Sequence, residues 1–163
     1  MKTFIINILI LFVFTSCCHY PTNYSLFITN NSVDALGCYY YLVWEGGKEG
    51  IVYPDTTLVS LRTNEVIGIK AGQTFHDSRP LSPITEWISS LPHDTLSVFF
   101  LSKDTLNAYS WEEIKLGYKI LQRYDLSIED INHLYNKYGV PEIPYPPSEV
   151  MRDMKMYPPY EGD

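Results

Sequence analysis

The chain has 163 residues, a length typical of one domain, and 45% of them are hydrophobic, which suffices to bury a core. Its 19 acidic residues exceed its 12 basic residues, giving a formal net charge of −7 at pH 7. Nucleic acids bind basic surfaces, so this balance argues against a nucleic-acid partner.

Residues 1–16 are typical of an export signal. Lys2 supplies a positive charge, and an almost unbroken apolar run follows from Phe4 to Phe14. This run of about 11 residues is too short for a membrane-spanning helix, which needs about 20. It has instead the length of the apolar region of a signal peptide.

The segment Phe14-Thr15-Ser16-Cys17 resembles a bacterial lipobox, in which a peptidase cuts before a cysteine that carries lipid. Ser16 is the small residue that the cleavage requires and Cys17 is the thiol, although the usual pattern has Leu where this chain has Phe14. Several acyl chains on one residue give stable anchoring. The resemblance implies that Cys17 is lipidated and that residues 17–23 form a tether.

Residues 24–139 are predicted to form a β-rich globular domain with C-terminal helices. Short β-prone runs alternate with turn signals, as in antiparallel sandwiches. The expected fold class is therefore mainly β, an antiparallel β-sandwich-like domain with one or two short helices near the C-terminus, and an α+β domain is the alternative. The runs are YSLFITNNS, ALGCYYYLVW, IVYPDTTLVSL, NEVIGIKAGQTF and TLSVFFLS.

Two helices are predicted near the end of this domain. Ser110 is a candidate N-cap for SWEEIKLGYKI. In LSIEDINHLYNKYG, Ser127 and Asp130 have the spacing of a capping box, and Gly139 is a natural C-terminal stop. Residues 119–126 between them are expected to be extended.

From residue 140 to residue 163 the sequence is rich in Pro and Tyr, and Tyr-Pro-Pro occurs at 145–147 and again at 157–159. Proline excludes regular helix and central strand. One interpretation is a polyproline-like ligand for a partner with an aromatic groove. The preferred one is an extended C-terminal extension that packs its tyrosines on the domain or stays free of it.

No catalytic residue, metal site or cofactor is predicted. The four histidines lack the spacing of helical metal pairs. The sequence His76-Asp77-Ser78 holds the residue types of a catalytic triad, but neighbours in sequence cannot reproduce the geometry of a triad. A polar loop is the preferred interpretation of these three residues.

Aromatic residues are the unusual feature of the composition, with 14 Tyr, 7 Phe and 3 Trp. Exposed indole rings stack on sugars, which makes Trp44, Trp87 and Trp111 candidates for glycan stacking. Aromatic residues also favour strands and supply core area, and that interpretation is preferred.

Eight segments resemble small, functionally uncharacterised lipoproteins of Bacteroides-type Gram-negative bacteria, and the likeness covers most of residues 24–163. The group brings no catalytic residue to carry over, but it implies an envelope lipoprotein. The segments are ITNNS, YYYLVW, YPDTTL, IKAGQT, LSVFFL, SWEEI, ILQRYDLSIEDI and MKMYPPYEGD.

The resemblance has two further implications. Such bacteria export lipoproteins to the cell surface when acidic residues follow the lipidated cysteine, and CCHYPTN has none. An outer-membrane anchor facing the periplasm is therefore favoured over the cell surface. They also glycosylate Asp-Thr tripeptides, which makes Thr56, Thr95 and Thr105 candidate O-glycosylation sites, although turn chemistry explains each tripeptide equally.

Lipidation of Cys17 would leave Cys18 and Cys38 as an even pair in an oxidising compartment, and hence as a candidate disulfide. The function expected from these features is that of a non-catalytic, lipid-anchored cell-envelope protein. Its partners would be the membrane, through the N-terminal lipid, and an envelope protein or glycan. The alternative is an envelope hydrolase that uses scattered carboxylates or His76.

Overall fold

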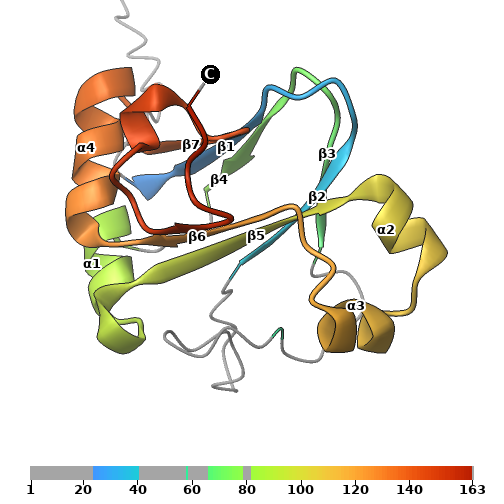
Figure 1. Cartoon of the computed structure of the whole chain (residues 1–163). Coiled ribbons are helices and arrows are strands. Elements are labelled where there is room, and N and C mark those ends of the chain that lie inside the picture. Colours follow the sequence, from blue (N-terminus) through green and yellow to red (C-terminus); the bar gives the residue numbers. More distant parts are fainter. Residues whose placement is uncertain (1–23, 41–57, 59–65, 79–81, 163) are drawn as a thin grey trace, which may run out of the picture.

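The computed structural model describes residues 24–40, 58, 66–78 and 82–162. Within these residues the protein is mainly β, with eight strands in two sheets and four short helices, which confirms the predicted fold class (Figure 1). The predicted strand residues 41–44 and most of the run 51–61 lie outside the described residues.

The three-stranded sheet has the order β4-β1-β7 and the five-stranded sheet the order β3-β2-β5-β6-β8. The strands are β1 (Leu26–Asn30), β2 (Leu36–Tyr40), β3 (Ile67–Ile69), β4 (Thr74–Asp77), β5 (Leu96–Ser102), β6 (Gln122–Leu126), β7 (Glu142–Tyr145) and β8 (Met156–Tyr157). The helices are α1 (Ile84–Ser89), α2 (Lys103–Ala108), α3 (Trp111–Gly117) and α4 (Ile128–Tyr138), with the 3₁₀ turns η2 (Pro92–Asp94) and η3 (Glu149–Met151).

The main core lies between the two sheets. Leu26 and Ile28 of β1 are fully buried against residues of β5 and β6 in one cluster. The rings of Phe100 on β5 and Tyr145 on β7 stack with centroids 5.1 Å apart. The hydroxyl of Tyr124 donates a hydrogen bond of 3.0 Å to the carbonyl of Pro144. These contacts hold the two sheets face to face.

A smaller core, the second cluster, covers the other face of the five-stranded sheet. Successive side chains of a strand point to opposite faces, so Phe99 and Leu101 of β5 point away from the main core. They are fully buried with Tyr39 of β2, Leu58 and Ile114 of α3. The run Val98 to Leu101 of β5 is therefore apolar on both sides, because both faces of the strand are covered there.

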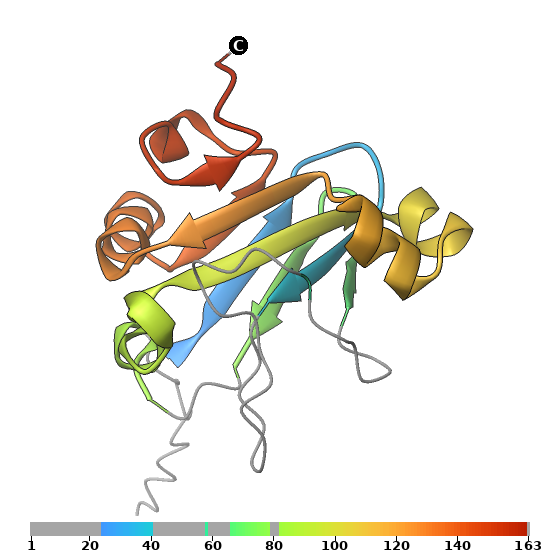
Figure 2. The same ribbon diagram turned by 60° about the horizontal axis from the view of Figure 1, so that its bottom comes forward.

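The helices lie in two groups at opposite ends of β5. Figures 1 and 2 show α1 and α4 at the end where β5 begins and α2 and α3 at the end where it stops. Ile84 and Ile88 of α1 and Ile131 and Leu134 of α4 complete the main core. The two helices near the C-terminus were predicted, whereas α1 and α2 were not.

The local end signals of the predicted helices are confirmed. Capping boxes join Ser110 to Glu113 in α3 and Ser127 to Asp130 in α4, and Gly139 ends α4 with φ +75°. Hydrogen bonds from the backbone and side chain of Ser110 lower the pKa of Glu113. A carboxyl whose pKa is lower in the folded than in the unfolded protein stabilises the fold at pH values above its unfolded pKa. The contribution of Glu113 to the cap is therefore lost as the pH falls through the pKa of Glu113 in the folded protein.

The segment 140–163, predicted as an extension, forms part of both sheets. β7 pairs in parallel with β1, with Ile28 opposite Ile143, and β8 pairs antiparallel with β6. Met151 between them is fully buried. Tyr145 packs on the ring of Phe100, whereas 52% of Tyr157 is exposed. The parallel pair departs from an all-antiparallel arrangement. Pro144 is tolerated because β7 is an edge strand.

Ser127→Ala should lower the free energy of unfolding by about 1 kcal/mol, because the backbone N–H of Asp130 loses its acceptor and the carboxylate of Asp130 loses the hydroxyl donor. Urea unfolding followed by tryptophan fluorescence measures this. Asn136→Ala, an exposed change in the same helix, should leave stability unchanged or slightly higher. Equal losses in both variants would contradict the role of the cap.

Candidate functional site

Several predicted site residues lie outside the described residues, namely Cys17, Cys18, Trp44 and Thr56. Lipidation of Cys17, the disulfide from Cys18, and any role of Trp44 or Thr56 stay predictions. The structure does place Cys38, Trp87, Trp111, Thr95, Thr105 and His76.

The two described tryptophans lie far apart in the fold. Trp87 on α1 is half-buried and packs against the main core. Trp111 begins α3 and lies edge-on to the ring of Tyr39, with centroids 5.6 Å apart and an interplanar angle of 70°. Since α1 and α3 occupy opposite ends of β5, the structure does not bring these two rings into one stacking platform (Figure 1).

Thr95 and Thr105 both lie at the boundary of an element. The hydroxyl of Thr95, which precedes β5, donates to the carbonyl of His93 over 2.8 Å. Thr105 lies in the first turn of α2, where its backbone N–H donates to the hydroxyl of the N-cap Ser102 over 2.9 Å. Both therefore make the local hydrogen bonds that turn chemistry predicts, and their glycosylation stays a prediction.

The interpretation of His76 and Asp77 as part of a polar loop is wrong. Both belong to β4, where they pair with Phe27 and Leu26 of β1. The exposed ring of His76 stacks on Phe27, with centroids 4.5 Å apart and planes at 1°. The buried Asp77 instead accepts a hydrogen bond from the hydroxyl of Tyr40. Neighbours on a strand face opposite ways, so Asp77 does not orient His76.

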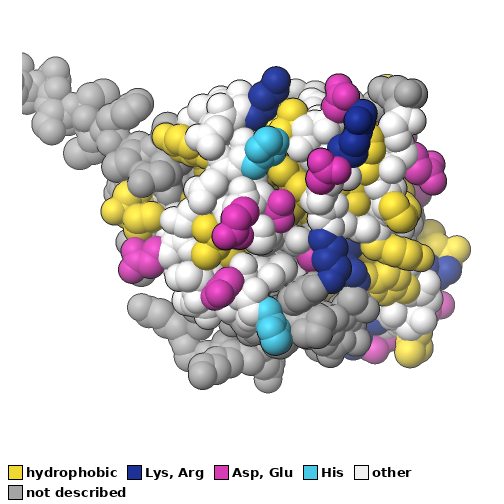
Figure 3. Space-filling model, turned by 60° about the vertical axis from the view of Figure 1, so that its left-hand side comes forward, with side chains coloured by type: hydrophobic (Ala, Val, Ile, Leu, Met, Phe, Trp, Pro, Cys, Tyr) yellow, Lys and Arg dark blue, Asp and Glu magenta, His cyan; other side chains and the backbone are white. Residues whose placement is uncertain are grey.

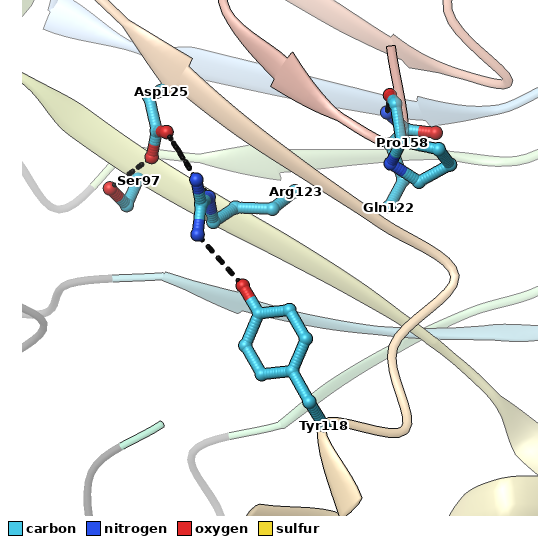
Figure 4. Close-up of polar contacts among 6 residues, drawn as sticks. All are labelled: Ser97, Tyr118, Gln122, Arg123, Asp125 and Pro158. Atoms are coloured by element: carbon cyan, nitrogen blue, oxygen red, sulfur yellow. Dashed lines mark hydrogen bonds and ion pairs between the residues drawn. The ribbon is translucent and has the colours of Figure 1, made fainter. Parts of the chain in front are cut away.

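A polar network crosses β5 and β6 on the face that carries the second cluster (Figure 4). The hydroxyl of Ser97 donates to Asp125 over 2.7 Å, and the two residues are directly opposite each other in register. Arg123 donates to the other oxygen of Asp125 from Nε over 3.1 Å and pairs with it from a terminal nitrogen at 3.0 Å. Its remaining nitrogen donates to the hydroxyl of Tyr118 over 2.8 Å.

The charged groups of this network are paired with other members of the network. Each carboxylate oxygen of Asp125 accepts from a named donor, and the side chains of Asp125 and Arg123 are 1% and 11% exposed. A nearby contact, from Gln122 to the carbonyl of Pro158 over 2.7 Å, ties the C-terminal segment to β6 (Figure 4). The arrangement fits a structural cross-link between strands, because a buried ion pair requires its charges to be satisfied.

An apolar groove of about 520 Å³ lies at the β3 edge of the five-stranded sheet. Its floor includes Gly37 of β2 and Gly68 of β3, which are register partners. Leu106 of α2 forms one wall, and among the described residues of the lining the ionisable ones are Lys70 and Lys103. The sequence gives no signal for this site, because its lining comes from three separate segments, 35–37, 66–70 and 103–107, which only the tertiary fold brings together.

Acidic side chains stand between the Lys and Arg side chains on the side of the molecule that carries α1 and α4 (Figure 3).

Among residues 24–40, 58, 66–78 and 82–162, no three His, Cys, Asp or Glu side chains gather as a metal site would require. Within the same ranges, no helix combines the length and apolar character needed to cross a membrane. Comparison with protein-family models, curated proteins and solved structures gives no match for this chain.

Cys38 should resist alkylation by iodoacetamide in the folded protein and react once the protein is unfolded without reductant. Burial, and to a smaller extent the charge of Asp77, raises the pKa of its thiol well above the usual range, and the thiolate is the reactive form. Mass spectrometry of the peptide that contains Cys38 measures the labelling. No labelling even after unfolding would support the disulfide with Cys18, whereas rapid labelling of the folded protein would contradict the buried position.

Asp125→Ala should lower the free energy of unfolding by about 3 kcal/mol, because Arg123 would keep its charge in a nearly buried position without this partner. Ser97→Ala should cost about 1 kcal/mol, since only one neutral donor is lost. Urea unfolding provides both values. As a control, Glu149→Gln removes an ion pair to Arg152 whose side chains are 78% and 59% exposed, and should change stability by less than about 0.5 kcal/mol.

Proposed function

We propose that the protein is a lipid-anchored cell-envelope protein that acts without catalysis, through contacts with an envelope protein or a glycan. The observation that carries the proposal is the apolar run Phe4 to Phe14 followed by Ser16 and Cys17. The lipid on Cys17 would hold the protein in the outer membrane, on the periplasmic face. The resemblance to lipoproteins of Bacteroides-type bacteria supports the same location.

The start of the described domain is compatible with a short anchor. Ser25 and Leu26 are already buried, and only residues 18–23 separate Cys17 from Tyr24, the first described residue. A chain extends by at most about 3.6 Å per residue, so the lipidated residue and the domain would stay within about 25 Å of each other. The domain would therefore work next to the membrane surface.

The hydrolase alternative finds less support in the described residues. It requires two or more ionisable side chains that converge in a pocket. Among the described residues, the groove at the β3 edge has Lys70 and Lys103 as its ionisable lining, and His76 stacks on Phe27 apart from Asp77. Asp125, the carboxylate of the polar network, already accepts hydrogen bonds from Arg123 and Ser97. A role in contacts fits these side chains better than a role in hydrolysis.

Cys17→Ala should abolish incorporation of an alkyne-bearing palmitate and release the protein from membranes washed with alkaline carbonate. The physical reason is that the thiol of Cys17 is the attachment point, and the apolar run alone is too short to span a bilayer. Gel fluorescence and fractionation report the two effects. The matched control is Cys18→Ala, which should remain labelled and membrane-bound.

Two outcomes would contradict the proposal. Labelling that is lost in Cys18→Ala but kept in Cys17→Ala would move the anchor by one residue, and labelling in neither wild type nor variant would remove the lipid anchor. For the second half of the proposal, purified wild-type protein that degrades isolated envelope glycan or peptide would favour the hydrolase. Capture of one glycan class on an array, or of one envelope protein after cross-linking, would support the contact role.

A further inference from the structure

The groove at the β3 edge has an electrostatic character opposite to that of the whole chain. The chain has seven more acidic than basic residues, yet the ionisable side chains among the described residues of the groove are two lysines. Lys70 follows β3 and Lys103 begins α2, and both are exposed. No Asp, Glu or His is among the described residues that line it. The groove therefore favours an anion over a cation or a neutral polar molecule.

The floor of the groove is open because it is made by two glycines. Gly37 and Gly68 face each other across β2 and β3. A Cβ atom at Gly37 would lie 2.5 Å from Leu106 Cδ1 and 2.6 Å from Val66 Cγ1, so these two side chains close over that half of the floor. A Cβ atom at Gly68 would meet no described atom within 4 Å. The half of the floor at Gly68 is thus bare backbone with no described atom close above it.

The apolar side chains over this floor are those of Val66 and Leu106, whereas Leu36 and Ile69, which also border the groove, bury their side chains in the main core. Small-molecule sites are typically apolar hollows of about 300–1,000 Å³ with a few polar groups that fix the orientation of the ligand. A groove of about 520 Å³ with two ammonium groups has this composition and size.

We propose that this groove binds a small amphipathic carboxylate, such as a medium-chain fatty acid. The hydrocarbon chain lies over the open backbone at Gly68, beside Leu106 and Val66, and the carboxylate lies between the ammonium groups of Lys70 and Lys103. This binding goes beyond the proposed anchoring and contact role, and it depends only on the folded domain.

Photo-crosslinking of the full-length protein in isolated membranes with a diazirine-bearing decanoate tests the proposal. Mass spectrometry should map the cross-link to residues 66–70 or 103–107. Excess decanoate should compete and decanol should not, because only the carboxylate pairs with the lysines. Octanoate should compete less well than decanoate, by up to about fourfold per methylene that the groove buries.

Gly68→Leu should reduce labelling at least about tenfold, because the new side chain occupies the open floor that the hydrocarbon chain requires. The free space around this position lets the variant fold, and thermal unfolding checks that it does. Asn136→Leu, which adds the same bulk at an exposed site on α4, should leave labelling unchanged.

Lys70→Gln and Lys103→Gln should each weaken competition by decanoate about two- to fivefold, the range of a solvent-exposed ion pair. Lys137→Gln, on the exposed part of α4, is the matched control for loss of a positive charge and should have no effect. Both groove lysines are exposed, so these variants keep the test valid if Gly68→Leu fails to fold.

Three results would overturn the proposal: cross-links outside the groove, competition by decanol equal to that by decanoate, or full labelling of folded Gly68→Leu. Cys17→Ala separates this proposal from the anchoring proposal. That variant should lose the membrane, but at a probe concentration raised until labelling saturates it should still give the mapped cross-link, because the groove lies within the folded domain. Loss of the cross-link in Cys17→Ala that remains folded would show that the labelling came from the bilayer.

Discussion

The structure depends on the need to bury both faces of β5. Val98 and Phe100 point to one side of the strand, Phe99 and Leu101 to the other, and all four are fully buried. One side takes the three-stranded sheet together with α1 and α4, and the other takes the second cluster with α3. A strand whose central residues are apolar on both faces has to lie inside the sheet, and β2 and β6 accordingly flank it.

The same requirement explains why the C-terminal segment belongs to the fold. The main core needs a cover over Phe100 and Tyr124, and β7 supplies it through Tyr145 and Pro144. Proline composition predicts an extended backbone correctly, but it says nothing about where an extended segment lies. The parallel pairing of β7 with β1 joins residues more than 110 positions apart, which no local pattern can indicate.

Features set by neighbouring residues could be predicted from the sequence, and features set by distant residues could not. The caps at Ser110 and Ser127, the stop at Gly139 and the apolar run of β5 follow from short-range rules, and the structure has them. The run NEVIGIKAGQTF was predicted to be β-rich, but the sequence does not indicate that β3 and β4 within and after it belong to different sheets. The groove and the polar network depend even more strongly on residues that are distant in sequence. The groove depends on the opposition of Gly37 and Gly68, and the Asp125 network on a strand register, and neither leaves a signal in a single segment.

The anchor and the groove rest on independent observations, but their chemistry is complementary. Amphipathic carboxylates partition into a bilayer, because transfer of their methylenes out of water is favourable. A domain held within about 25 Å of the lipidated residue would meet them at a higher effective concentration than the same domain free in solution. Weak binding in an open groove with exposed lysines would then suffice for appreciable occupancy. An apolar floor with positive charges at its rim is thus better suited to a tethered domain than to one that has to find its ligand by free diffusion.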